Sequence, residues 1–338
     1  MNLCIITNES VFKKDQKYFC DNLDLKSIPE ELSKHFEVSV YARHSKQDRN
    51  NEINTQNINI FRSLFSFIFE FPKKIKKQNS HYLLISLTPI TLIASLILSL
   101  YRKKYFLYLR SDGFKEYKSI LGFYGPFIYY LIFSIGTKFA KLISCRDHLL
   151  RGKQGKIVSP SQLSEKWFLN RINPELNKPK LLYVGRLKIE KGIFSLLNLL
   201  KKDELNIDLT IVTSEKNNKS KILQKNISIF SHQNINDSII KFYDTHNIFI
   251  LPSFTEAHPQ VLDEALARFR PVIIFDDIKH VVRNRKGVFV SSRNINSLKN
   301  KIKYIMENYE NIQKDLRNNV LPTKKAFIND LKNIIGKG

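Results

Sequence analysis

Two cationic residues, Arg186 and Lys191, lie in a short turn between a predicted strand that ends at Gly185 and a predicted helix that begins near Gly192. A helix N-terminus presents free N–H groups and the positive end of the helix dipole. A forked guanidinium and an ammonium add charge that suits phosphate binding. These residues predict a diphosphate-binding turn, although solvated basic residues in an ordinary loop give the same pattern.

A second group of polar residues follows the predicted strand that ends near Ser253. Glu256 and His258 lie in a loop, Pro259 suits the first turn of a helix, and Glu264 lies about one turn inside that helix. Open α/β sheets bind ligands at the carboxyl ends of their strands, and a carboxylate accepts two hydrogen bonds from sugar or ribose hydroxyls. The spacing indicates a hydroxyl-binding site. The alternative is that Glu256 caps the helix and Glu264 is exposed.

Together the two segments resemble the retaining GT-B glycosyltransferases of family 4. That family has a Gly-Arg…Glu-Lys-Gly loop, then a Pro-Ser turn, two glutamates with seven residues between them, and a Pro-Val-Ile strand. The clear match covers about Leu181 to Ile274, and the N-terminal half is similar only in pattern. The matching residues are Gly185-Arg186, Glu190-Lys191-Gly192, Pro252-Ser253, Glu256, Glu264-Ala265 and Pro271-Val272-Ile273.

The resemblance implies transfer of a sugar from a nucleoside-diphosphate donor, UDP- or GDP-linked, to a hydroxyl acceptor. It implies that Arg186 and Lys191 bind the diphosphate, that Glu264 binds the ribose, and that Glu256 binds the transferred sugar and is catalytic. It also implies that no metal and no cofactor is needed, because the cations neutralise the leaving diphosphate. With backbone amides included, the implied donor site is Gly185, Arg186, Lys191, Glu256, Ala257, His258, Pro259, Gln260 and Glu264.

The chain departs from the family pattern at Ala257 and Phe269, where glycine is frequent. It holds only 11 glycines in total, and glycine permits close approach of backbone to ligand. A catalytically silent GT-B scaffold within a polysaccharide-assembly complex is therefore one alternative. A GT-B nucleotide-sugar epimerase, which would isomerise the donor without an acceptor, is another.

The N-terminal half is expected to bind the acceptor, a carbohydrate or a lipid-linked sugar. The segment from Tyr108 to Phe114 ends a predicted strand and places Asp112 in a loop at the cleft, where it is proposed as a catalytic or acceptor-side residue. An Asp-Gly turn explains Asp112 equally well. Lys13 and Lys14, in the predicted loop after the first strand, would meet acceptor charge or solvent.

The elements that must position these residues form a repeating pattern of strands and helices. Continuous runs of Val, Ile and Leu alternate with helix-like segments, which is typical of parallel sheets covered on both faces. We therefore predict an α/β protein of the GT-B type, with two Rossmann-like domains facing a central cleft. The predicted divisions are an acceptor domain at 1–160, a linker at 161–178, a nucleotide-sugar domain at 179–321, and a C-terminal helix at 322–338 that crosses back to the first domain. Polar tracts at Ser45–Asn59 and Ser214–Asn226 are predicted as loops.

Composition narrows the classes of partner. The 55 Lys and Arg against 31 Asp and Glu give a formal charge of +24, which attracts anionic lipids and phosphorylated ligands. Compositional drift explains the charge as well. No nucleic-acid partner is expected, because no recognised RRM, zinc-finger or helix-turn-helix pattern occurs. The three cysteines, Cys4, Cys20 and Cys145, have no paired spacing and fit a reducing compartment.

Three apolar segments raise the question of membrane contact. Leu83–Leu100 is long enough to span a bilayer, but Pro89 favours a buried strand followed by a buried helix. Phe61–Lys77 and Leu121–Lys141 combine aromatic residues with lysines, as interfacial helices do, although core helices with basic ends show the same pattern. We expect a cytoplasmic protein attached peripherally to the inner face of the cytoplasmic membrane.

Overall fold

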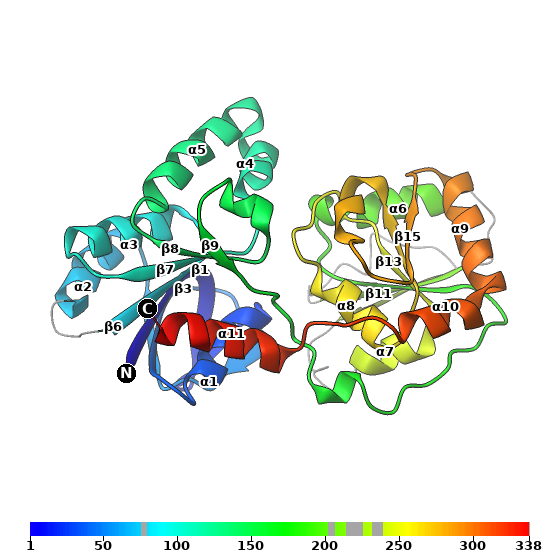
Figure 1. The fold of residues 1–338 in the computed structure, drawn as a ribbon, viewed down its shortest axis with the longest axis horizontal. Helices are drawn as coiled ribbons and strands as arrows, with labels where there is room; N and C mark the ends of the chain where they lie inside the picture. Colours follow the sequence, from blue (N-terminus) through cyan, green and yellow to red (C-terminus); the bar gives the residue numbers. More distant parts are fainter. Residues whose placement is uncertain (76–79, 202–206, 214–225, 232–238, 338) are drawn as a thin grey trace. The chain divides into compact units, whose positions relative to one another are not determined.

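A computed structural model of the protein describes residues 1–75, 80–201, 207–213, 226–231 and 239–337. The chain divides into two compact units, the first formed by Met1–Gln162 and Lys324–Gly338 and the second by Leu163–Thr323. Each unit is an α/β layer structure around its own sheet (Figure 1). The helix predicted after Pro322 is thus part of the first unit.

The first unit is built on a mainly parallel sheet. β1 pairs in parallel with β3 and β6, and its second half continues into the segment predicted as a loop and forms an antiparallel hairpin with β2. The hairpin places Lys13 and Lys14 on an exposed strand end instead of in a loop. The strands are β1 Asn2–Lys14, β2 Lys17–Cys20, β3 Glu37–His44, β4 Asn51–Ile53, β5 Asn57–Phe61, β6 Ser80–Ile85, β7 Tyr105–Leu109, β8 Lys141–Ser144 and β9 Gly155–Ile157.

Helices cover both faces of this first sheet. Figure 1 shows α2, α3 and α5 on one side and α1 and α11 on the other, and α11 contacts α1. The three cysteines are buried free thiols. The helical segments are α1 Leu23–Leu32, α2 Leu64–Ile75, α3 Pro89–Leu100, α4 Gly113–Leu121, η1 Gly122–Tyr124, α5 Gly125–Gly136, η2 Asp147–Leu150 and α11 Lys324–Gly336.

The apolar segment at Leu83–Leu100 forms a strand and a helix, as predicted. β6 ends at Ile85, and α3 begins at Pro89 with Thr88 as its N-cap in a capping box with Thr91. Proline suits this first position because its missing N–H would have no helical partner there. The segment is therefore part of the core of the first unit.

The polar tract Ser45–Asn59, predicted as a loop, contains β4 and the first residues of β5. This prediction is wrong in part, because polar residues are tolerated where edge strands face solvent. Most of the second tract, Ser214–Asn226, lies outside the described residues, as do the last two lysines of the Phe61–Lys77 segment.

The second unit has a six-stranded parallel sheet in the order β12-β11-β10-β13-β14-β15. The order reverses beside β10, and Figure 1 shows α6 on one side of the sheet and α7 and α8 on the other. The elements are η3 Glu165–Trp167, β10 Lys180–Val184, η4 Ile189–Lys191, α6 Ile193–Leu200, β11 Asp208–Thr213, β12 Ile227–Ser231, α7 Ile239–Thr245, β13 Ile248–Leu251, α8 Gln260–Ala267, β14 Val272–Phe275, η6 Asp276–Val281, β15 Val288–Ser291, α9 Ile295–Glu307 and α10 Tyr309–Leu316.

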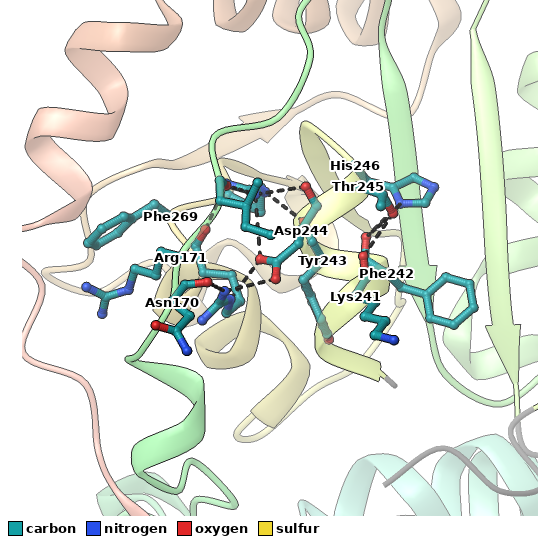
Figure 2. Close-up of polar contacts among 12 residues, drawn as sticks. Asn170, Arg171, Lys241, Phe242, Tyr243, Asp244, Thr245, His246 and Phe269 are labelled. Atoms are coloured by element: carbon teal, nitrogen blue, oxygen red, sulfur yellow. Dashed lines mark hydrogen bonds and ion pairs between the residues drawn. The ribbon is translucent and has the colours of Figure 1, made fainter. Parts of the chain in front are cut away.

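Residues 163–178, which make up most of the predicted linker at 161–178, are counted with the second unit. Trp167 packs edge-on against Tyr243 at 5.4 Å between ring centroids. The Arg268 guanidinium donates two hydrogen bonds to Asp244 and further bonds to the carbonyls of Trp167, Leu169 and Asn170. Figure 2 shows Asp244 and Asn170 within this network. Buried tertiary bonds therefore fix a segment whose composition alone indicates a flexible connection.

Candidate functional site

The predicted donor residues of the second unit lie in two loops that leave the same edge of the sheet. β10 and β13 are parallel neighbours, with Leu181 opposite Ile248, and both loops follow the carboxyl ends of these strands. A backbone bond from the Phe254 N–H to the Glu190 carbonyl, 3.0 Å long, ties one loop to the other. This edge, beside the reversal of strand order, is where open α/β sheets bind ligands.

Gly192 permits this close contact between the loops. Its φ of +66° lies in the left-handed region, and an added Cβ would lie 1.8 Å from the carbonyl oxygen of Pro252. Any side chain here would have to displace the backbone of the second loop. The glycine that the sequence motif contains is therefore required by the packing of one loop on the other.

Lys191 and Glu256, predicted to bind the diphosphate and the sugar respectively, are in direct contact. The Lys191 Nζ lies 2.6 Å from the Glu256 Oε1, and the Ser253 hydroxyl donates to the same oxygen at 2.8 Å. Both charged side chains retain partial exposure, 22% for Lys191 and 11% for Glu256. Because both side chains are partly accessible, a ligand at this sheet edge can reach the Lys191 ammonium and the Glu256 carboxylate.

Gly185 and Arg186 occupy the start of the first loop. The Gly185 N–H donates to the Val212 carbonyl at 2.9 Å, which continues the strand pairing. The Tyr183 hydroxyl donates to the carbonyl of Arg186 at 2.8 Å and so fixes the backbone there. The Arg186 side chain is exposed. The contact of the Arg186 side chain with a diphosphate remains a prediction. The Tyr183 hydroxyl fixes the backbone of Arg186, and the guanidinium is accessible to solvent.

Glu264 lies inside α8 and is nearly buried, with 9% of its surface exposed. Its Oε2 accepts a 2.7 Å hydrogen bond from the hydroxyl of Tyr243 on α7. Burial raises the pKa of Glu264 to about 7, with a contribution from the neighbouring Asp263, while the bond from Tyr243 acts in the opposite direction. The alternative that Glu264 is simply exposed is therefore wrong. A buried carboxylate with one oxygen already paired suits selective acceptance of ligand hydroxyls.

Polar contacts of Asp263 stabilise the segment between the two glutamates. The Asp263 carboxylate accepts two bonds from Arg285, at 2.7 and 2.9 Å, and lies 3.3 Å from the Nε2 of His258. Although burial opposes ionisation, the bonds from His258 and Arg285 lower the pKa of Asp263 below its ordinary value. The His258 side chain is almost fully buried, so it positions the loop that carries Glu256.

The donor site implied by the resemblance includes backbone amides at Ala257–Gln260. Pro259 is the N-cap of α8 and has no N–H, so it offers no amide hydrogen bond. Any amide contact in this segment must come from Ala257, His258 or Gln260. Pro259 instead fixes the backbone at the point where α8 begins.

Two further residues that the sequence did not identify hold the second loop. The guanidinium carbon of Arg293 lies 4.1 Å from the ring centroid of Phe254 and 4.3 Å from that of Phe275. The same guanidinium donates a hydrogen bond to the Pro252 carbonyl. The His280 Nε2 lies 2.8 Å from the Glu256 carbonyl. Both residues lie more than 20 positions beyond Glu256, and no local pattern connects them with the loop.

Asp112, the acceptor-side candidate, lies in the first unit. It is the N-cap of α4, accepts a 3.2 Å bond from the Phe114 N–H, and lies 3.5 Å from a guanidinium nitrogen of Arg151. The cavity beside Asp112 has about 10 Å³, which is room for one water molecule. In the first unit taken alone, Asp112 is a capping residue, and its predicted catalytic role stays a prediction.

Within the described ranges, no group of three or more His, Cys, Asp or Glu residues is placed to hold a metal ion. The adjacent Asp276 and Asp277 lie in η6, where Asp277 pairs with Arg293.

Comparisons with known proteins indicate the family that the second unit resembles. Residues 165–321 match the model of a family described as Glycosyl transferases group 1. A curated relative, the "Putative teichuronic acid biosynthesis glycosyltransferase TuaC" of Bacillus subtilis (strain 168), is 33% identical over 106 residues. That match covers 31% of this chain and only 27% of the relative.

Solved structures match over the whole chain. Sucrose-phosphate synthase from Thermosynechococcus elongatus has a TM-score of 0.72 at 14% identity, covering 100% of this chain and 99% of that one. Anabaena Alr3699/HepE in complex with UDP and glucose has a TM-score of 0.71 at 10% identity, covering 99% of each chain. At these identities the likeness shows the fold, which is the GT-B fold that the sequence predicted.

Proposed function

We propose that the protein transfers a sugar from a nucleoside-diphosphate donor to a hydroxyl acceptor with retention of configuration. The premise is the match of residues 165–321 to the group 1 glycosyl transferases, together with the GT-B fold of the chain. The observation that carries this proposal is the contact of Lys191 with Glu256, which joins the loops at the carboxyl ends of β10 and β13. The second loop leads into α8, which carries the nearly buried Glu264, so one cation and two carboxylates are available for the three parts of such a donor.

In the proposed reaction the bond from the anomeric carbon to the diphosphate breaks. The acceptor oxygen forms the new bond to that carbon, and the proton of the acceptor hydroxyl passes to the released diphosphate. Lys191 exchanges Glu256 for phosphate oxygens, and Arg186 adds a second charge, so that both stabilise the negative charge on the leaving diphosphate. Glu256, released from Lys191, accepts hydrogen bonds from the transferred sugar, and Glu264 accepts them from the ribose.

The proposed acceptor is a carbohydrate or a lipid-linked sugar in the assembly of a bacterial surface polysaccharide or glycolipid. Support for this class comes from the partial match to a teichuronic acid glycosyltransferase. We place the protein in the cytoplasm, attached peripherally to the inner face of the membrane, where such an acceptor is presented. The charge of +24 is compatible with attraction to that surface.

A screen of nucleotide sugars against the full chain tests the proposal. We expect one UDP- or GDP-linked sugar to raise the melting temperature and to bind in calorimetry, also in the presence of EDTA. With an acceptor, NMR of the product should show the anomeric configuration of the donor. Isomerisation of the donor without acceptor would identify an epimerase, and an absence of binding to every nucleotide sugar would favour the silent scaffold.

A further inference from the structure

The helical hairpin formed by α4, η1 and α5 exposes an unusual amount of apolar surface. Ten of the large hydrophobic side chains that are exposed in the described part of the chain lie between residues 120 and 139. The most exposed are Phe123 at 91%, Ile120 at 73% and Tyr124 at 71%, followed by Phe127 and Phe139 at 65% each. Monomeric soluble proteins rarely leave such a patch uncovered, and larger patches mark interaction sites.

The hairpin is a rigid, folded unit. Phe114 packs edge-on against Tyr129, at 4.8 Å between centroids, and Tyr117 lies 5.1 Å from the same ring. A Cβ on Gly125 would lie 2.0 Å from the Tyr117 carbonyl oxygen, so the helices touch through backbone. Figure 1 shows α4 and α5 side by side. The exposed side chains are therefore held outward and do not result from a loosely placed segment.

By length and composition alone, the helical run Gly113–Gly136 could cross a membrane, and only 22% of its most apolar window is buried. Its geometry argues against a straight span. Gly122 has a φ of +61°, and the chain reverses there. α5, with 12 residues, is about 18 Å long at 1.5 Å per residue, whereas the hydrocarbon core is ~30 Å thick. A hairpin of this size is too short to span that core.

The charge distribution identifies the surface that suits this hairpin. No charged residue occurs between Lys118 and Lys138, and both lysines are exposed. At the base of the hairpin, the Arg151 guanidinium lies 4.4 Å from the Phe114 ring centroid and the Lys153 Nζ lies 6.0 Å from that of Phe133. Uncharged aromatic residues at the turn with cations behind them match the apolar interface and the anionic headgroups of a bilayer.

The other aromatic segment of this unit does not share these features. In α2, Phe67 and Phe71 are buried and stacked at 4.9 Å, and Phe71 packs against Tyr41. Of the four phenylalanines of that helix, Phe65 and Phe69 are exposed, at 74% and 68%. Half of the aromatic side chains of α2 therefore pack in the core, whereas Phe123 and Tyr124 of η1 both face outward.

We propose that the α4–η1–α5 hairpin inserts its turn into the interfacial region of an anionic lipid bilayer and anchors the protein there. The inference deepens the proposed peripheral attachment, and its tests do not depend on sugar transfer. A bilayer fits better than a second copy of the chain because the greatest exposure lies at the turn between the helices, with lysines flanking both sides.

Tryptophan substitution provides a direct probe, since the only native tryptophan, Trp167, is buried. The full-length Phe123→Trp variant is mixed with vesicles of phosphatidylglycerol and phosphatidylcholine, and Phe65→Trp on α2 is the matched control. We expect a blue shift and quenching by brominated acyl chains for Phe123→Trp only. An unchanged spectrum at position 123, or equal shifts at both positions, would overturn the assignment to the hairpin.

Vesicle flotation of the full chain supplies the second test. The variant with Phe123, Tyr124 and Phe127 each changed to Ser should lose binding by about tenfold or more, while Phe65→Ser with Phe69→Ser should bind as the original chain does. The changed side chains are exposed, so circular dichroism should show unchanged folding. Nucleoside-diphosphate binding should persist in both variants, which separates this inference from the proposed function. Retained flotation of the triple variant would contradict the proposal. So would the finding that the original chain is a dimer and that the three substitutions convert it to a monomer.

Discussion

Two pairs of basic residues in the second unit have opposite environments. Arg268 and Arg270 are 1% exposed, and their guanidinium groups donate to Asp244 and to backbone carbonyls. Arg186 is exposed, and Lys191 pairs with Glu256, which is itself predicted to bind the transferred sugar. Basic residues thus stabilise the fold in one place and face a proposed polyanion in the other. What distinguishes them is whether protein atoms already satisfy every donor.

The largest effect is expected from Arg268→Ala. Removal of one member of a buried, hydrogen-bonded pair costs about 3–5 kcal/mol, because Asp244 is left buried without its partner. Denaturant unfolding of the full chain should show this loss. Arg186→Ala, an exposed arginine in the same unit, is the control and should change the unfolding free energy by less than about 0.5 kcal/mol. Equal losses for both variants would erase the distinction between the two pairs.

A smaller effect, on ligand affinity, is expected from Lys191→Ala. A hydrogen bond to a charged group contributes about 1.5–3 kcal/mol, so nucleoside-diphosphate binding should weaken on the order of 10- to 100-fold in calorimetry. Lys188→Ala, an exposed lysine three residues earlier, should bind the ligand as the original chain does. If both variants bind equally well, the turn is not a phosphate site.

The raised pKa of Glu264, about 7, predicts a pH-dependent stability. Between the ordinary pKa of 4.5 and about 7 the folded state retains a proton that the unfolded chain has lost. The contribution of Glu264 to stability is therefore full below 4.5 and falls as pH rises through this window. Unfolding measured from pH 4.5 to 8 should show a decline that Glu264→Gln removes. Parallel profiles for the two proteins would show that Glu264 has an ordinary pKa.

The smallest effect is expected from Tyr243→Phe, which removes the hydroxyl that lowers the pKa of Glu264. Its loss should raise that pKa by on the order of one unit, since one unit corresponds to about 1.4 kcal/mol. If ribose binding needs the carboxylate, the pH midpoint for nucleoside-diphosphate binding should rise accordingly. The Glu264→Gln variant lacks the titrating carboxyl, so the pH dependence that it retains reports ionisation of the ligand itself. An unmoved midpoint would mean that Tyr243 does not tune Glu264.

The sequence alone determined the α/β class, because runs of Val, Ile and Leu mark buried parallel strands wherever they occur. It also determined the family-like residues of the donor loops, since Gly185, Arg186, Lys191, Glu256 and Glu264 form a pattern of local spacings. The same pattern does not predict five of the strands, because they are short or polar and depend on pairing with distant residues. These strands are β2, β4, β8, β9 and β15.

Only the tertiary structure decided how these residues are used. Lys191 meets Glu256 across 65 positions, and Tyr243 meets Glu264 across 21. Phe67 and Phe71 of α2 are buried in a core, whereas Phe123 and Tyr124 of η1 and Phe127 of α5 are exposed, although both segments are rich in aromatic residues. Such contacts depend on which elements are neighbours in space. Spacing along the chain fixes the face of a single helix or strand, but only the packing of one element on another determines what that face meets.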